Sequence, residues 1–251
     1  MGKGLLFMDN LRDIIAGLGY LPDSGWGWDN FGRTLEAYIG ACNLGRVLEI
    51  GGGRSPLFSE EDVRRLGIEY TVNDIAQEEL DLGPSHVSKV CFDISDRNLR
   101  VSDTYDLVFS RMVFEHLPDA GAAYRNLHRL LREDGLAVIF YPTLFSPPFV
   151  LNRILPEWVS SRLVGWLFRN RNHLQVPKLR AYYSRCYGKS SWMSRMLKEA
   201  GYSEWCIAPF YGHNYFEKVP VLRSIDRRLS QAAKAHGWQL LSSYAYCIAR
   251  K

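Results

Sequence analysis

Cysteine is scarce in this sequence, and its spacing excludes two kinds of site. The 251 residues include five scattered cysteines, and no Cys-x-x-Cys pair occurs among them. Structural zinc sites and disulfide frameworks both depend on paired cysteines at regular spacings. We therefore expect reduced, mostly buried thiols in a cytoplasmic protein without a structural zinc ion.

Long hydrophobic runs are also missing. No stretch of about 18 apolar residues occurs, so we expect no membrane-spanning helix. Residues 1–7 are too short for a secretory signal, and an acid follows them too soon. Internal repeats and low-complexity stretches are absent as well. The chain is 47% hydrophobic and 23% charged, which suits one globular domain with a sizeable core.

Acidic residues become rare in the second half of the chain. Residues 1–134 carry 14 Lys and Arg against 22 Asp and Glu, a net charge of −8. Residues 135–251 carry 17 against 5, a net charge of +12. This asymmetry indicates either that the C-terminal half meets an anionic partner or that its basic face is solvated.

A glycine-rich turn is the most informative stretch that is present. Residues 46–50 are a short apolar run, Gly51-Gly52-Gly53 follow it, and a helix is expected from Ser55-Pro56 onward. Glycines allow the backbone to approach a ligand closely, and a helix N-terminus attracts carboxylates and phosphates. The dinucleotide fingerprint requires a third glycine where Pro56 stands, and a phosphate-binding loop requires a Gly-Lys-Ser/Thr sequence that is absent here.

Strand and helix patterns then alternate along the chain. Further strands are expected at 68–74, 87–92, 106–110 and 136–141, with helices between them, which favours a mostly parallel α/β sheet. Ligands of such sheets bind beyond the carboxyl ends of the strands. Five residues fall at those predicted ends: Glu49, Gly51, Asp74, Asp93 and Ser110.

These features together resemble a known family. The E-x-G-x-G sequence of Glu49, Gly51 and Gly53, an acid about two dozen residues later, and the Glu115-His116 pair after the fourth strand resemble class I S-adenosylmethionine-dependent methyltransferases. The resemblance covers about residues 46–141. One departure is Ser55, where the family often has a third glycine.

The resemblance implies a fold and a division of the chain. The expected architecture is a Rossmann-like, seven-stranded, mostly parallel sheet with helices on both faces and an antiparallel last strand between the fifth and sixth. A helical substrate cap would be inserted after the fifth strand at 142–191. Residues 1–45 would form an N-terminal helical lid, and residues 46–251 the methyltransferase domain.

The resemblance also implies a cofactor and its ligands. S-adenosyl-L-methionine would place its ribose hydroxyls on Asp74 and its adenine amino group on Asp93, with Ile94 packing on the ring. An ordinary turn is the alternative role for Asp74. Met112 stands where metal-binding relatives carry an acid, so no metal is expected. The full set of cofactor-binding candidates is Glu49, Gly51, Gly53, Asp74, Asp93, Ile94, Ser110 and Arg111.

Catalytic and substrate-binding residues are less well defined by the sequence. His116, His173 and His213 are the candidate bases, although a structural role that orders the turn is favoured for His116. Aromatic and basic residues fill 142–191, which suits a sugar, an aryl ring, a phosphorylated group, single-stranded nucleic acid, a membrane surface at 149–168, or a small core of the cap itself. The substrate-binding candidates are Trp26, Tyr182, Tyr183 and Arg185.

The resulting hypothesis is methyl transfer to an oxygen of a small molecule or glycan, with an anionic acceptor allowed by the charge. An RNA or protein methyltransferase that uses the basic half is an alternative. It is less favoured because the chain lacks the Asn/Asp-Pro-Pro-Tyr type of sequence after the fourth strand. Enzymes acting on lipid-linked substrates and non-catalytic S-adenosylmethionine-binding proteins remain further alternatives.

Overall fold

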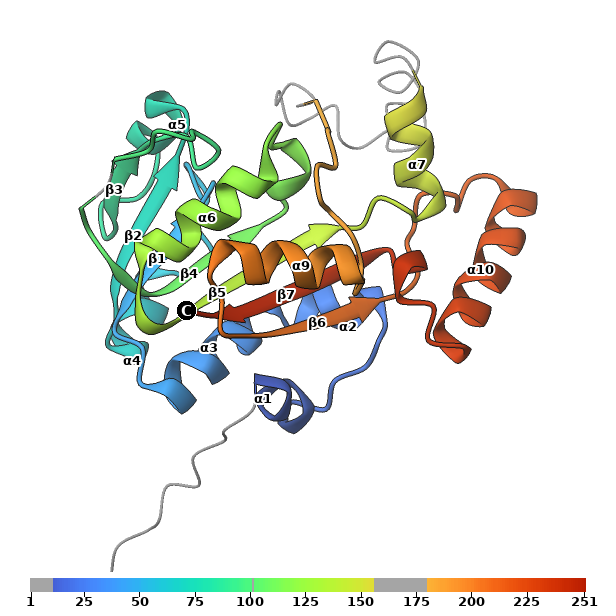
Figure 1. The fold of residues 1–251 in the computed structure, drawn as a ribbon, viewed down its shortest axis with the longest axis horizontal. Coiled ribbons are helices and arrows are strands. Elements are labelled where there is room, and N and C mark those ends of the chain that lie inside the picture. Colours follow the sequence, from blue (N-terminus) through green and yellow to red (C-terminus); the bar gives the residue numbers. More distant parts are fainter. Residues whose placement is uncertain (1–10, 101, 156–179) are drawn as a thin grey trace, which may run out of the picture.

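A seven-stranded sheet forms the centre of the protein (Figure 1). The computed structural model describes residues 11–100, 102–155 and 180–251. The strands are ordered β3-β2-β1-β4-β5-β7-β6, and only β7 runs antiparallel to its neighbours. Their bounds are β1 Arg46–Ile50, β2 Glu69–Asp74, β3 Ser88–Cys91, β4 Tyr105–Arg111, β5 Leu131–Pro142, β6 Glu204–Phe210 and β7 Tyr244–Arg250. The fold class expected from the sequence is confirmed.

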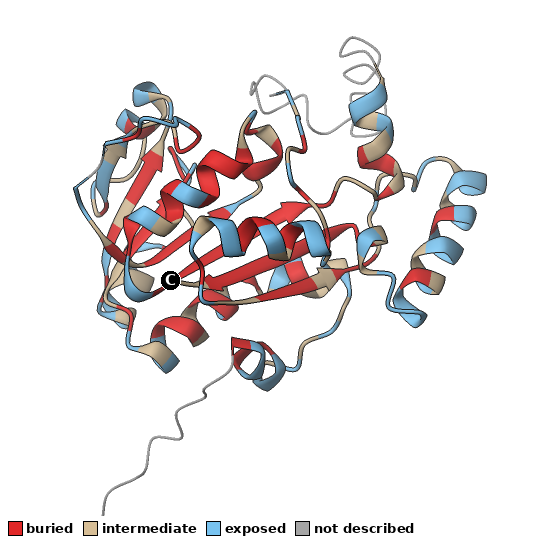
Figure 2. Cartoon of the chain, in the orientation of Figure 1, coloured by how far each residue is buried: buried red, intermediate tan, exposed pale blue. Residues whose placement is uncertain are grey.

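The central strands are buried because helices cover both faces of the sheet (Figures 1 and 2). Residues 107–109 of β4 and 136–141 of β5 are almost completely buried, as continuous apolar runs in parallel sheets require. α6 and α9 cover one face, whereas α1, α2, α3 and α4 lie on the other. The bounds of the α-helices are α1 Leu11–Gly17, α2 Ser24–Asp29, α3 Phe31–Cys42, α4 Glu60–Leu66, α5 Gln77–Asp81, α6 Ala120–Leu130, α7 Pro147–Ile154, α9 Ser191–Ala200 and α10 Pro220–Ala235.

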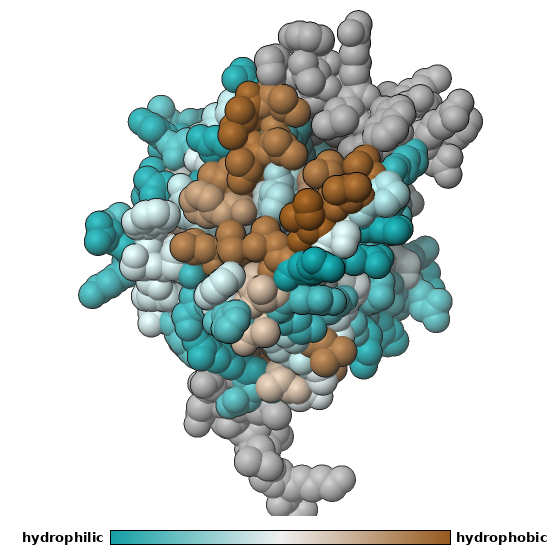
Figure 3. Space-filling view, turned by 90° about the vertical axis from the view of Figure 1, so that its right-hand side faces the viewer, coloured by the Kyte–Doolittle hydropathy of each residue, from teal (hydrophilic) through white to brown (hydrophobic). Residues whose placement is uncertain are grey.

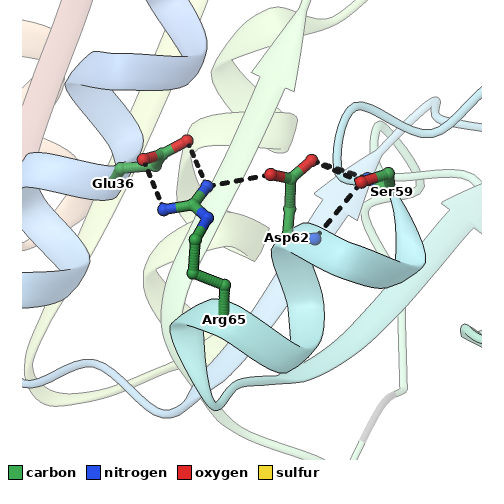
Figure 4. Close-up of polar contacts among 4 residues, drawn as sticks. All are labelled: Glu36, Ser59, Asp62 and Arg65. Carbon is green, nitrogen blue, oxygen red and sulfur yellow. Dashed lines mark hydrogen bonds and ion pairs between the residues drawn. The ribbon is translucent and has the colours of Figure 1, made fainter.

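The helix after the glycine turn starts later than the sequence predicted. Its N-cap is Ser59, not Ser55, because the Ser59 hydroxyl accepts the Asp62 N–H while the Asp62 carboxylate accepts the Ser59 N–H. Arg65 donates to both Asp62 and Glu36 of α3, so this network also ties α4 to α3 (Figure 4). Residues 51–58 are consequently an irregular loop, with no helix N-terminus beside the glycines.

The N-terminal segment is packed tightly against the sheet. Phe31, Leu35 and Tyr38 of α3 are buried in the main core. Farther upstream, the Ser24 N–H donates to the Tyr211 carbonyl, and the Tyr211 N–H donates to the Pro22 carbonyl. Residues 20–30 are thereby joined to the carboxyl end of β6. A separate lid at 1–45 stays a prediction.

The insertion after β5 is described at its two ends. It begins with α7, and it returns through residues 180–190, where Tyr183 and Cys186 are buried. The Leu144 N–H donates to the Cys186 carbonyl over 2.7 Å, which closes the base of the insertion. Leu151 and Ile154 of the predicted membrane-contacting stretch 149–168 are exposed, whereas residues 156–168 and the candidate base His173 lie outside the described residues. No helix within the described ranges is long and apolar enough to cross a membrane.

Candidate functional site

The glycine turn after β1 lies directly against two neighbouring segments. Gly51 and Gly53 adopt φ values of +74° and +46°, which side-chain-bearing residues rarely adopt. A Cβ at Gly51 would lie 2.5 Å from Cγ2 of Val113, and a Cβ at Gly53 would lie 2.8 Å from Oδ2 of Asp74. Glycine is therefore required twice, and the turn lies close against the carboxylate at the end of β2.

The two carboxylate oxygens of Asp74 have different neighbours. Its Oδ1 accepts the Ala76 N–H over 3.0 Å, which fixes the side chain in a turn, while Oδ2 lies beside Gly53. The residue is only half-buried. A carboxylate held in this way beside an open glycine backbone can accept hydrogen bonds from a pair of vicinal hydroxyls.

Asp93 lies near Asp74 because β2 and β3 pair up to Cys91 and the Phe92 N–H donates to the Asp74 carbonyl. Its Oδ1 accepts both the N–H and the hydroxyl of Ser95, each over 2.7 Å. Ile94 is buried, and its carbonyl accepts from Asn126. The structure thus brings Asp93 and Ile94 to the same edge of the sheet, in a turn whose shape Ser95 and Asn126 determine.

Glu49 supports the glycine turn from within the protein. It is 3% exposed, and its Oε2 accepts the Leu57 N–H over 2.9 Å and the Tyr70 hydroxyl. Burial raises the pKa of Glu49, and these two hydrogen bonds together with the Arg111 charge act in the opposite direction. The carboxylate therefore anchors the far end of the 51–58 loop.

We call the glycine turn together with Asp74 and Asp93 the glycine rim. The end of β4 lies beside it. Ser110 is fully buried, and its hydroxyl donates to the Ile50 carbonyl over 3.3 Å, which links the ends of β1 and β4. Arg111 is exposed, and Met112 follows with φ +57°, a left-handed conformation for a non-glycine residue. This sharp turn directs Val113 onto Gly51.

The Glu115-His116 pair holds the returning end of the insertion. The Glu115 carbonyl accepts the N–H groups of Tyr182 and Tyr183 over 2.7 and 3.0 Å, and His116 Nδ1 contacts the Arg180 carbonyl over 2.8 Å. Since a carbonyl only accepts, Nδ1 carries the proton in this contact. His116 thus has a positioning contact, in agreement with the structural role considered for it.

Glu115 was missed as a site residue, although its neighbour was selected. It is 5% exposed, and its Oε2 has no hydrogen-bond partner within the described parts of the chain. Burial raises the pKa of Glu115 to about 8. Glu115 lies in the short 3₁₀ turn Phe114–His116, and no pattern in the sequence predicts that its side chain is buried.

A cavity of about 1310 Å³ opens farther along the same edge of the sheet. β6 runs parallel to β5 because each pairs antiparallel with β7, so Phe210, Pro142 and Tyr244 share the carboxyl edge with the glycine turn. Residues from 23–29, 211–218 and α10 line the cavity, together with Tyr244. Trp28 lines this cavity and lies edge-on to Tyr244 and to Phe140, which pairs with Arg111 at the end of β4.

The predicted substrate contacts lie elsewhere. Trp26 stacks on Phe210 and packs against Tyr20, so its neighbour Trp28 lines the cavity in its place. Tyr183 is buried and its hydroxyl accepts from Asn152, while Tyr182 and Arg185 are exposed on the returning segment. The 211–215 turn, which contains the candidate base His213, does line the cavity.

His213 lies in the cavity wall with both ring nitrogens engaged. Its Nε2 lies 3.1 Å from Asp226 Oδ1, and its Nδ1 accepts the Tyr215 N–H over 3.2 Å. The side chain is fully buried, which favours a structural role over proton transfer. In the described part of the chain, no three His, Cys, Asp or Glu side chains gather into a metal site.

Comparison with known proteins agrees with this geometry. Residues 19–203 match the family described as methyltransferase domain. The ubiquinone biosynthesis O-methyltransferase of Xanthomonas oryzae pv. oryzae is 27% identical over 163 residues, which are 61% of this chain and 66% of that protein. The chain thus spans slightly less than two thirds of this curated relative.

Two solved structures share the fold. Phosphoethanolamine N-methyltransferase 2 of Haemonchus contortus, in complex with S-adenosyl-L-methionine, has a TM-score of 0.51 and 15% identity over 82% of this chain and 48% of its own. An S-adenosylmethionine-dependent methyltransferase of Mesorhizobium loti has a TM-score of 0.50 and 15% identity over 83% and 91% of the two chains. The glycine turn, the acids beside it and the family match identify this chain as a class I S-adenosylmethionine-dependent methyltransferase.

Proposed function

We propose that this methyltransferase transfers the methyl group of S-adenosylmethionine to a hydroxyl oxygen of a small molecule. The cavity beyond β6 and β7 carries the proposal. It lies at the same edge of the sheet as the glycine turn, and its volume of about 1310 Å³ accommodates a small acceptor. The oxygen specificity is supported by the name of the curated relative, an O-methyltransferase.

The glycine rim supplies the cofactor side of the proposed site. Gly51 and Gly53 leave open backbone, Asp74 accepts the ribose hydroxyls, and Asp93 accepts the adenine amino group. Arg111 is exposed near the same edge. Glu49 and Ser110 act indirectly in this proposal, because their side chains bond to the protein.

The chain's own residues mainly align the reactants. The sulfonium of the cofactor is the electrophile when bound, so the protein must hold the acceptor oxygen in line with its methyl group and exclude water. Trp28 and Tyr244 line the cavity and pack edge-on against each other. Burial raises the pKa of the Tyr244 phenol, which keeps it protonated and able to donate a hydrogen bond to an acceptor oxygen.

Proton removal from the acceptor is proposed for His116 if the acceptor is an alcohol. His116 follows β4 in the turn Phe114–His116, at the carboxyl edge of the sheet, and its Nδ1 contact with the Arg180 carbonyl orients the ring. A phenolic acceptor needs less help because it ionises more easily.

Transfer of radiolabelled methyl from S-adenosylmethionine to a panel of phenols, alcohols, amines and glycans tests this function. We expect label in a hydroxylated small molecule, recovered as a methyl ether by mass spectrometry. Replacement of Trp28 by Ala should lower turnover while calorimetric binding of the cofactor persists. Labelling of RNA or protein in place of small molecules, or cofactor binding with no transfer to any acceptor, would contradict the proposal.

A further inference from the structure

α10 places a row of long polar side chains along the cavity. Arg223, Arg227, Ser230, Gln231 and Lys234 all line it. Their spacings of four, three, one and three residues place them on one face of a helix. Asp226 and Ala233 are buried on an adjacent face and anchor α10 to the body of the protein.

The remaining face of α10 is hydrophobic and exposed to solvent. Val221, Leu222, Ile225 and Leu229 are exposed, with Val221 70% exposed. Figure 3 views the side of the molecule formed by α7 and α10, and hydrophobic surface lies there directly beside hydrophilic surface. The cationic residues of α10 are therefore concentrated toward the cavity, with Arg228 as an exposed cation outside its lining.

The three cations of the cavity row lack protein counterions. In the residues that the structure describes, neither Arg223, Arg227 nor Lys234 has a hydrogen bond or ion pair through its side chain. Arg223 and Arg227 are also one helical turn apart, and like charges at this spacing destabilise a helix. An anion between them would remove this repulsion.

Carboxylates in the same cavity do not fill this role. Asp226 is engaged by His213, and Asp23 accepts the Gly25 N–H at the start of α2. Asp29 and Glu217 also line the cavity, but among the described residues neither forms an ion pair with a cation. The α10 side of the cavity is thus the side suited to an anionic group.

The other end of the cavity is aromatic. Trp28 is 43% exposed, and it meets Tyr244 edge-on at a centroid distance of 5.7 Å. Trp28 also meets Phe140 of β5, which pairs with Arg111 at the end of β4, so we place the acceptor hydroxyl beside Trp28. The α10 cations line the same cavity from a separate element. A single acceptor spanning the cavity would meet aromatic side chains at its reacting end and guanidinium groups at its other end.

We propose that Arg223, Arg227 and Lys234 form an anion subsite, and that the acceptor is a hydroxylated aromatic compound with a carboxylate or phosphate. The proposal rests on the function proposed above. Guanidinium groups bind both anions through paired hydrogen bonds, and such charge-assisted bonds are about twice as strong as neutral ones. Trp28 and Tyr244 provide edges and faces for an aromatic ring.

Binding measurements test this subsite without requiring turnover. Calorimetry with saturating S-adenosylhomocysteine would compare 3,4-dihydroxybenzoate, 3,4-dihydroxyphenyl phosphate and the neutral 3,4-dihydroxybenzamide. The wild-type protein should bind one of the anions roughly tenfold or more tightly than the amide. The affinities for the carboxylate compound and for the phosphate compound show which of the two anions the subsite prefers. The Arg223→Gln, Arg227→Gln double variant should lose that preference and retain its affinity for S-adenosylhomocysteine.

Arg228→Gln is the matched control, because Arg228 is on the same helix and outside the cavity lining. It should keep the full preference, and circular dichroism should show both variants folded. Equal effects of the control and the double variant, or no anion preference in the wild type, would overturn the subsite. Binding with the expected preference but without any methyl transfer would overturn the proposed function alone.

Discussion

At the scale of single residues, the site depends on close contacts between groups far apart in the sequence. Asp74 faces Gly53, and Val113 faces Gly51, at distances that leave no space for a side chain on either glycine. Contacts of this kind give each residue a measurable role, because removing one group leaves the others in place.

Asp74→Ala should weaken binding of S-adenosylmethionine. If Asp74 accepts the ribose hydroxyls, their loss of a charged partner costs about 1–3 kcal/mol, or roughly a five- to 150-fold rise in Kd. Calorimetric titration measures this change. Glu78→Ala is the control, because Glu78 is an exposed acid on the following helix. Equal affinity of Asp74→Ala and wild type would remove Asp74 from the cofactor site.

Glu115→Gln should change the pH dependence of stability. Burial raises the pKa of Glu115 from 4.5 to about 8, so the folded state favours the neutral carboxyl. Its contribution is complete below pH 4.5 and is lost as the pH rises toward 8, a change on the order of 3 kcal/mol at pH 7. Glutamine cannot ionise, so the variant should gain stability relative to wild type as the pH rises.

Urea unfolding at pH 5, 7 and 8.5 measures this difference, with Glu78→Gln as an exposed control. A wild-type protein and Glu115→Gln variant with parallel stability profiles over this range would show that Glu115 ionises normally.

At the scale of elements, the strands were predicted well and the caps less well. The ends of β2, β3 and β4 lie within one residue of the predictions, because apolar and β-branched runs define buried strands directly. β5 begins earlier than expected, at Leu131, since Asp134 adopts φ +63° and the strand continues through an irregular pairing.

The start of α4 shows why local signals can mislead. Ser55-Pro56 and Ser59 both offer a plausible beginning, and the choice is made by the reciprocal bonds between Ser59 and Asp62 and by the Arg65–Glu36 ion pair across to α3 (Figure 4). The Ser59 hydroxyl is also the main reason that the pKa of Asp62 falls to about 2. The tertiary partner Glu36 is not visible in the local sequence.

Ser59→Ala should lower the free energy of unfolding by about 1 kcal/mol, the usual cost of losing an N-cap. Ser55→Ala is the matched control, because Ser55 is exposed and was the cap expected from the sequence alone. Denaturant unfolding with both variants measures the difference. A larger loss for Ser55→Ala would place the functional cap at Ser55.

At the scale of the whole molecule, the parallel topology gathers the cofactor rim at one edge. That coincidence was predictable, because the carboxyl ends of parallel strands must meet there. The acceptor cavity was not predictable in the same way. Its walls come from 23–29, 211–218 and α10, and no pattern in the sequence states that these three segments converge.

Bound cofactor product should stabilise the whole fold. S-adenosylhomocysteine at 100 times its Kd adds about 2.7 kcal/mol to the free energy of unfolding. For a chain of this size that corresponds to a rise in Tm of roughly 5–10 °C. Thermal scanning with and without the ligand measures the rise, and Asp74→Ala should show a smaller one at the same concentration. An unchanged Tm in the wild type would contradict specific binding to the folded state.

The bridge between Ser24 and Tyr211 has a consequence for biosynthesis. A ribosome that has released residues up to Glu115 has already delivered every cofactor-rim residue, and domains tend to fold as they emerge. The acceptor cavity has to wait, because its walls combine residues 23–29 with Tyr244, which is translated after all its other lining residues. A nascent chain therefore contains the residues proposed to bind S-adenosylmethionine before the cavity proposed for the acceptor is complete.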